Sequence, residues 1–394
     1  MLPCPSMQLP MPKFSSTKSN EACSLSGWQQ GELDRIWFSV SEEATLGKLS
    51  RRDFAKNTSL GALGGLTATS FAVAARPQGE ASARESAPKR MTTQLREMIK
   101  SPGVIDSPGI HDPLTARIAE SIGFRCVNLS GPGLGVVSCE VEAALSLDDL
   151  ADATQRITSA INIPLLVDAG GGFGEPAHVF HTVRVLEHAG AAGLCLDDQV
   201  CPKRFHYYMD GRTETIAIEE MVEKIRYGVQ ARRDPDFVIG ACTAAMNTHG
   251  FAECVRRANL CLQAGADYVL LFPRTLEETQ QIPKEVQGPL NFANAEQGMP
   301  ERPNFSAQEL GAMGWRILNH PSAIALLYYK AMRDALLRLK ESGNLGMDAS
   351  VFGPVHKELY QTIGLNTYYV IEYWTSRLGS RGAPGTYDPE FQPK

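Results

Sequence analysis

The chain has 394 residues and a formal net charge of −6 at pH 7, with 21% charged and 43% hydrophobic residues. This balance is typical of a soluble globular protein, and no basic patch in it points to a nucleic-acid partner. An α/β barrel takes about 250 residues as one unit, so a single barrel with extensions accounts for the length. The nine cysteines form neither a C-x-x-C pair nor a Cys/His cluster with metal spacing, which indicates reduced, mostly buried thiols.

The N-terminal part has the composition of an extension followed by a targeting signal. Residues 1–49 carry Pro, Ser and Lys clusters without periodicity, and we expect them to be disordered. Residues 50–75 contain Arg51-Arg52, an uncharged Gly/Ala-rich stretch and an A-x-A end, as a twin-arginine export signal does. The stretch is too weakly apolar for stable membrane insertion. We expect export to the periplasm, or a cytoplasmic protein if translation starts after the signal.

The alternative for that stretch is an accidental arginine pair before a flexible linker. Residues 76–90 are polar, and we expect them to be a linker whether or not residues 50–75 are an export signal.

Residues 91–340 show one repeating unit, in which a short apolar run is followed by a helical pattern. Eight such alternations favour a closed (β/α)8 barrel of the TIM type over an open sheet. The expected strands are 104–105, 126–129, 165–167, 194–196, 237–239, 268–272, 290–293 and 317–318, and the expected helices lie near 112–122, 147–160, 176–190, 217–233, 251–264, 275–282, 306–313 and 321–339. Residues 341–394 form an aromatic-rich helical extension, which indicates packing on another surface or another subunit.

Two expected strands end in an acidic residue, Asp168 and Asp197. The C-terminal strand ends of a parallel barrel build its active face, so both carboxylates are candidate metal ligands or acid/base groups. The alternative is that each acid only caps the helix that follows it.

Two glycine turns follow expected strands. Residues 170–174 fit neither G-x-G-x-x-G nor the P-loop pattern, but they allow a small ligand to approach the backbone above Asp168. The turn that starts at Ser130 contains Gly131 and Gly133, and its N–H groups could hold a carboxylate. A plain flexible loop is the competing interpretation.

Lys203 and Arg204 follow Asp197 by six and seven residues. Cations beside carboxylates suit an anionic substrate that is bound through a divalent metal. A solvated surface pair is the alternative.

The stretch from Thr92 to Leu339 resembles the isocitrate lyase and phosphoenolpyruvate mutase superfamily. The motifs that carry the resemblance are Ser130-Gly131, D-A-G-G-G-F-G at 168–174, D-D-Q-V-C-P-K-R at 197–204 and A-R-R-D-P-D-F-V-I at 231–239. The resemblance implies a barrel whose members cleave or form C–C or P–C bonds next to a carboxylate, with C-terminal helices swapped between subunits. We therefore expect a homodimer or homotetramer.

The resemblance also implies roles for single residues. Asp168 and Asp197 would bind Mg²⁺, with Glu142 as a third acid, and Ser130, Gly131, Gly133 and Asn294 would bind the substrate. The chain departs from the superfamily pattern at several polar positions. Its residues there are Gly170, Cys242, Ala244 and Phe272.

A further departure concerns the catalytic acid. The lyases that act on isocitrate or methylisocitrate carry a cysteine in K-R-C-G-H, whereas this chain reads Lys203-Arg204-Phe205-His206-Tyr207. Those two activities are therefore not assigned. His206 and Tyr207 are both candidate proton donors, beside Lys203 and Arg204 as charge-stabilising groups.

Together these features predict a lyase that cleaves a C–C bond in a small 2-hydroxy or 2-oxo carboxylate, through an enolate stabilised by weakly bound Mg²⁺. One alternative is a barrel that has lost its chemistry and serves as a binding or structural protein. The other is P–C bond chemistry on a phosphonate.

Overall fold

The computed structural model describes residues 89–205, 213–296 and 302–375. The expected extension (1–49), the expected export signal (50–75) and all but the last two residues of the linker lie outside the described residues. His206 and Tyr207 do so too.

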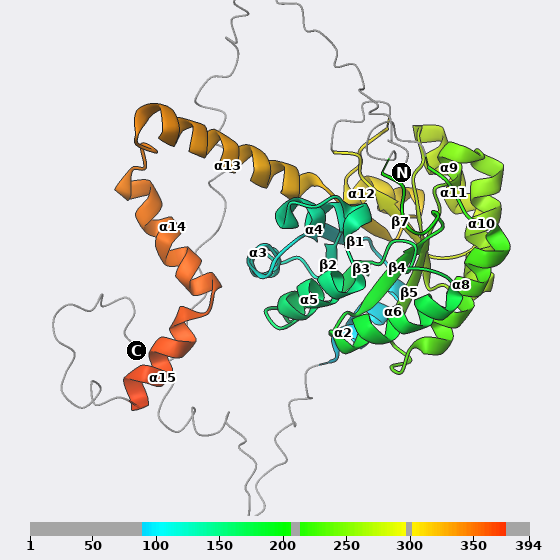
Figure 1. The fold of residues 1–394 in the computed structure, drawn as a ribbon, viewed down its shortest axis with the longest axis horizontal. Helices are drawn as coiled ribbons and strands as arrows, with labels where there is room; N and C mark the ends of the chain where they lie inside the picture. Colours follow the sequence, from blue (N-terminus) through cyan, green and yellow to red (C-terminus); the bar gives the residue numbers. More distant parts are fainter. Residues whose placement is uncertain (1–88, 206–212, 297–301, 376–394) are drawn as a thin grey trace, which may run out of the picture. The chain divides into compact units, whose positions relative to one another are not determined.

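Eight parallel strands form a closed barrel, which confirms the predicted fold class (Figure 1). Each strand pairs with the next one in sequence, and β8 pairs with β1 to close the ring. The strands are β1 (Ile105–Ile110), β2 (Val127–Leu129), β3 (Leu165–Asp168), β4 (Gly193–Asp197), β5 (Val238–Cys242), β6 (Tyr268–Leu271), β7 (Leu290–Ala293) and β8 (Ile317–His320).

Helices follow the strands and surround them (Figure 1). Their starts are set by local capping, as at α5, where Ser146 and Asp149 form a capping box. The helices are α2 (Met91–Lys100), α3 (Pro113–Ser121), α4 (Gly131–Ser138), η1 (Glu142–Ala144), α5 (Leu147–Thr158), α6 (Pro176–His188), α8 (Ile218–Ala231), α9 (Ala245–Thr248), α10 (Phe251–Gln263), α11 (Leu276–Glu285), α12 (Ala307–Met313), α13 (Ala323–Ser342), α14 (Ala349–Thr362) and α15 (Leu365–Thr375).

Alternate residues of each strand divide between two hydrophobic clusters. Leu165 and Val167 face outward into the cluster between strands and helices, whereas Leu166 belongs to the cluster inside the barrel. The inner cluster also contains Cys195 and Cys242. Of the seven free cysteines in the described ranges, five are buried, as the sequence predicts.

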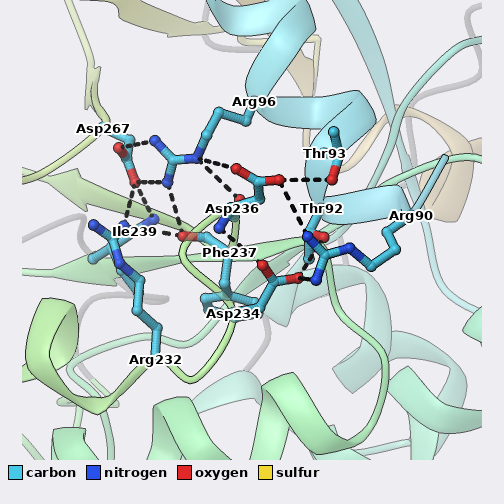
Figure 2. Close-up of polar contacts among 10 residues, drawn as sticks. All are labelled: Arg90, Thr92, Thr93, Arg96, Arg232, Asp234, Asp236, Phe237, Ile239 and Asp267. Carbon is cyan, nitrogen blue, oxygen red and sulfur yellow. Dashed lines mark hydrogen bonds and ion pairs between the residues drawn. The ribbon is translucent and has the colours of Figure 1, made fainter.

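Helix α2 contributes Leu95, Met98 and Ile99 to the inner cluster, so it closes the N-terminal end of the barrel. Figure 2 shows the polar contacts that hold it there. Arg96 donates two hydrogen bonds to the carboxylate of Asp267, at 2.8 and 3.0 Å. Thr92 and Thr93 donate to Asp234 and Asp236. The A-R-R-D-P-D-F-V-I motif therefore serves the closed end of the barrel.

The stretch after β2 is a helix, which the sequence did not indicate. Ser130 caps α4 by accepting a hydrogen bond from the Gly133 N–H at 3.1 Å. A Cβ at Gly135 would lie 2.6 Å from the backbone carbonyl oxygen of Glu140, so glycine is needed there for close packing. A helix of such composition has no amphipathic pattern from which it could be predicted.

The three C-terminal helices have little buried surface. Ala325 is the only buried residue among the 20 of α13, and α14 has none. Arg117 of α3 donates to the carbonyl of Thr362 at 3.0 Å, which ties α14 to the barrel. Within the described ranges, no helix combines the length and apolar character needed to cross a bilayer.

Candidate active site

Four charged side chains meet at the C-terminal strand ends. Asp168 ends β3, Asp197 ends β4, Glu142 lies in η1 after β2, and Lys203 lies in the loop after β4. The Lys203 ammonium donates to Glu142 Oε1 at 2.8 Å and lies 3.8 Å from Asp197 Oδ2. The structure thus brings together four of the residues that the sequence singled out.

Asp197 is buried and held on both oxygens by Gln199. The Gln199 backbone N–H donates to Oδ1 at 3.0 Å, and its side-chain amide donates to Oδ2 at 2.7 Å. Burial is the main cause that raises the pKa of Asp197 to about 7, against the opposing effect of Lys203. Because burial makes this carboxylate costly to ionise, a cation bound beside it would stabilise its charged form.

Asp168 has a similar environment. Burial, and next the nearby Glu142 carboxylate, raise the pKa of Asp168, while Lys203 and the amides of Gly170 and Gly131 lower it. The Gly170 N–H donates to Asp168 Oδ1 at 3.0 Å. Asp168 therefore does not cap α6, whose N-cap is Glu175, and Asp168 and Asp197 both lie close to the charges of Glu142 and Lys203.

These acids have the right chemistry for Mg²⁺, which prefers carboxylate oxygens. In the described ranges, however, no three His, Cys, Asp or Glu side chains are arranged so that they could hold a metal ion. The Lys203 ammonium is instead the cation that lies among the carboxylates.

The remaining predicted residues are more spread out. The Ser130 hydroxyl donates to the carbonyl of Pro321 at 2.6 Å, and Asn294 binds the backbone of Phe305 through both ends of its amide. Arg204 is half-exposed and lies 3.5 Å from Glu214. A role of these residues in substrate binding or catalysis stays a prediction.

Asp198 is a fully buried acid whose role the sequence did not reveal. It accepts hydrogen bonds from Thr243 Oγ1 at 2.6 Å, from the Ala244 N–H at 3.0 Å and from Arg257 at 3.0 Å. These contacts join the end of β4 to the β5 loop and to α10, and so fix the wall beside Asp197. The sequence signal for this role was the pair of adjacent acids, Asp197 and Asp198, at the end of β4. Successive side chains of a strand point to opposite faces, so only one of the two acids can face the inside of the barrel.

The family model for phosphoenolpyruvate phosphomutase matches residues 95–340 of the chain. The chain belongs to this family. The superfamily resemblance read from the motifs is thereby confirmed.

Two named relatives and one solved structure each align with 70% or more of this chain. A 2-methylisocitrate lyase of Aeropyrum pernix is 34% identical, over 70% of this chain and 87% of its own length. A 2,3-dimethylmalate lyase of Eubacterium barkeri is 32% identical, over 71% of this chain and 96% of its own. A crystal structure of phosphonopyruvate hydrolase with oxalate and Mg²⁺ superimposes with a TM-score of 0.65 and 26% identity, covering 73% of this chain and 99% of that one.

Proposed function

We propose that the protein is a carbon–carbon lyase that cleaves a small 2-hydroxy or 2-oxo carboxylate through an enolate, with Mg²⁺ as a weakly bound cofactor. The observation that carries this proposal is the group of three carboxylates around Lys203 at the C-terminal end of the barrel, of which Asp197 is buried and Asp168 and Glu142 are partly buried. Two relatives are named as lyases of small carboxylates, and a third binds oxalate with Mg²⁺.

As they stand, the three acids are arranged around Lys203 and not around a metal ion, so Asp168, Asp197 and Glu142 would have to turn toward one another to hold Mg²⁺. The chemistry that Mg²⁺ supplies when bound is electrostatic stabilisation of negative charge. Lys203 places a second positive charge beside Asp197 and Glu142, where it stabilises the anionic substrate. Gln199 and the Gly170 N–H fix the two aspartates, so the charges are oriented before the substrate arrives.

The cleavage balances without a further reactant. In a 2-hydroxy acid the C2 hydroxyl proton leaves, C2 becomes a carbonyl, and the electron pair of the broken C2–C3 bond forms an enolate with the carboxylate on C3. In a 2-oxo acid a hydroxyl at C4 loses its proton, and the electron pair of the broken C3–C4 bond forms an enolate with the 2-oxo group. The enolate carbon then takes up a proton. We assign proton transfer to Lys203 or to one of His206 and Tyr207, which follow it in the sequence.

The test uses the full chain with Mg²⁺ and a panel of 2-hydroxy and 2-oxo acids, with detection of the 2-oxo acid product. Asp168→Asn and Asp197→Asn should each lose activity by about 100-fold or more, whereas Asp152→Asn at an exposed position should not. Binding of Mg²⁺ without any turnover would favour a barrel that has lost its chemistry. Turnover of a phosphonate alone would favour P–C chemistry.

A further inference from the structure

The barrel wall changes from a charged to an apolar residue between the neighbouring strands β4 and β5. Strand register places Asp197 of β4 opposite Cys242 of β5, and Cys242 opposite Leu270 of β6. Neighbouring strands lie about 4.8 Å apart, so these three residues form one row along the barrel wall. Cys242 belongs to the inner cluster, and Leu270 packs against it.

The residues of β5 and β6 that continue this row, Cys242 and Leu270, have uncharged side chains. Cys242 is buried among the apolar residues of the inner cluster. Phe272, two residues beyond Leu270, also packs against the inner cluster. Leu270 and Phe272 are partly exposed and Cys242 lies buried beside them, so a ligand whose charged end lies at Asp197 meets an apolar lining on this side.

Arg302 holds Phe272 in place. Its Nε donates to the carbonyl of Pro273 at 3.2 Å, and its Nη2 donates to the carbonyl of Ala293 at 2.9 Å. The guanidinium lies over the Phe272 ring, 5.5 Å from its centroid. These contacts span the ends of β6 and β7 and make the aromatic ring a fixed part of the rim.

The row continues from Leu270 to Asn291 of β7. Asn291 is buried, and its Oδ1 has no hydrogen-bond partner among the described residues. A buried acceptor without a partner costs about 1–3 kcal/mol, which a hydroxyl group of a ligand would offset. An acceptor for a hydroxyl thus lies directly beside the apolar surface.

We propose that the β5–β6 side of the mouth is an apolar subsite, and that the substrate is a 2-oxo acid whose other arm carries a hydroxyl and an alkyl or aryl group in place of a second carboxylate. This inference rests on the proposed lyase function. The 2-oxo acid end lies at Asp168, Asp197 and Lys203, and the arm lies along Cys242, Leu270 and Phe272.

Such an arm also restricts the chemistry. Without a second carboxylate, only the 2-oxo group can accept the electron pair of the breaking bond. In a 4-hydroxy-2-oxo acid the C3–C4 bond breaks, the C4 hydroxyl loses its proton, and C4 becomes an aldehyde. The electron pair forms the enolate of pyruvate, whose C3 takes up a proton, so the products are pyruvate and an apolar aldehyde.

The experiment compares 4-hydroxy-2-oxoheptanoate with 4-hydroxy-2-oxoglutarate on the full chain with Mg²⁺. Both release pyruvate, so one coupled assay measures both. We expect kcat/KM to be at least about tenfold higher for the heptanoate. A preference for the glutarate, with a carboxylate reaching Arg302, would overturn the subsite while supporting the lyase function. Cleavage of neither compound would overturn the inference, and failure of the wider acid panel as well would overturn the proposed function.

Variants separate the subsite from a general loss of activity. Cys242→Arg should reverse the preference towards the glutarate, and Cys242→Ser, of similar size and uncharged, should keep it. If Cys242→Arg does not fold, Phe272→Ala is the second variant. It should raise KM for the heptanoate about tenfold and leave KM for the glutarate within about twofold. Equal effects on both substrates would contradict an apolar subsite.

Discussion

Gly170 has room for a larger side chain beside the three acids. Its φ is 51°, and no atom lies within 4 Å of the position that a Cβ would take. Aspartate adopts such left-handed conformations more readily than most residues. Because affinity of an oxygen site for Mg²⁺ rises with ligand charge, we expect Gly170→Asp to tighten Mg²⁺ binding by about 10- to 100-fold in calorimetry.

Two controls accompany that substitution. Gly103→Asp adds the same charge at another open glycine with positive φ, at the N-terminal end of β1, and should not change Mg²⁺ binding. Asp168→Ala should weaken it. No gain in the first variant together with no loss in Asp168→Ala would mean that this barrel does not use a metal.

His320 makes stability depend on pH. Its Nδ1 lies 2.5 Å from Glu296 Oε1 and its Nε2 lies 2.9 Å from Asp106 Oδ1. Burial opposes the charge, but the two hydrogen-bonded carboxylates outweigh it and raise the pKa of His320 to about 9. The folded value thus lies above the unfolded value of about 6.5. This stabilisation is complete below pH 6.5 and is lost as pH rises through 9.

Because His320 is partly exposed, solvent screens its interactions with the two carboxylates. We therefore expect the loss of its charge to lower the free energy of unfolding by about 1–2 kcal/mol between pH 6.5 and 9. Urea unfolding across that range measures it. His320→Gln should remove this part of the slope, and an unchanged slope in the variant would rule out His320 as its origin.

The element that closes the barrel, α2, depends on Asp267. This carboxylate binds Arg96 through both oxygens, lies 3.2 Å from Arg232 and accepts the Ile239 N–H at 2.9 Å. Removing its charge takes away the carboxylate that Arg96 and Arg232 both contact. Breaking a fully buried ion pair typically costs about 3–5 kcal/mol. We expect Asp267→Asn to lower the free energy of unfolding by about 2–3 kcal/mol, measured in urea.

The same substitution should leave KM nearly unchanged, because the contacts lie at the end of the barrel opposite the candidate site. Asp152→Asn, at an exposed position of α5, is the matched control for stability. A large change in KM with normal stability would contradict the structural role.

At the scale of the whole molecule, the C-terminal helices expose more apolar surface than a monomer usually does. Leu327, Tyr329 and Leu336 of α13 are about 60% exposed, and Tyr360 and Tyr368 are exposed on α14 and α15. We propose that these helices pack between subunits in an exchanged arrangement, in a homodimer or homotetramer. Leu327→Arg with Leu336→Arg should then weaken assembly at least about tenfold in sedimentation experiments.

A wild-type chain that sediments as a monomer at micromolar concentration would refute the exchanged arrangement. Lys330→Ala on the same helix, at an exposed position paired with Asp334, serves as the control that should not affect assembly.

The sequence by itself determined the barrel and the position of Asp168 and Asp197 at the ends of two of its strands. Strands and helices are predictable because their periodicity is local, and Asp168 and Asp197 stand at strand ends in any barrel of this pattern. Helix α4 could not be predicted, since Gly135 is required by the close approach of the Glu140 backbone, which only the folded chain makes.

Only the tertiary structure decided which distant residues meet. The Lys203–Glu142 pair joins positions 61 residues apart, and the row from Asp197 through Cys242 to Leu270 depends on the register of three strands. It also decided that the 231–239 motif serves α2 rather than the site. Strand register and loop closure set these contacts, and they follow from the packing of the whole barrel rather than from local residue patterns.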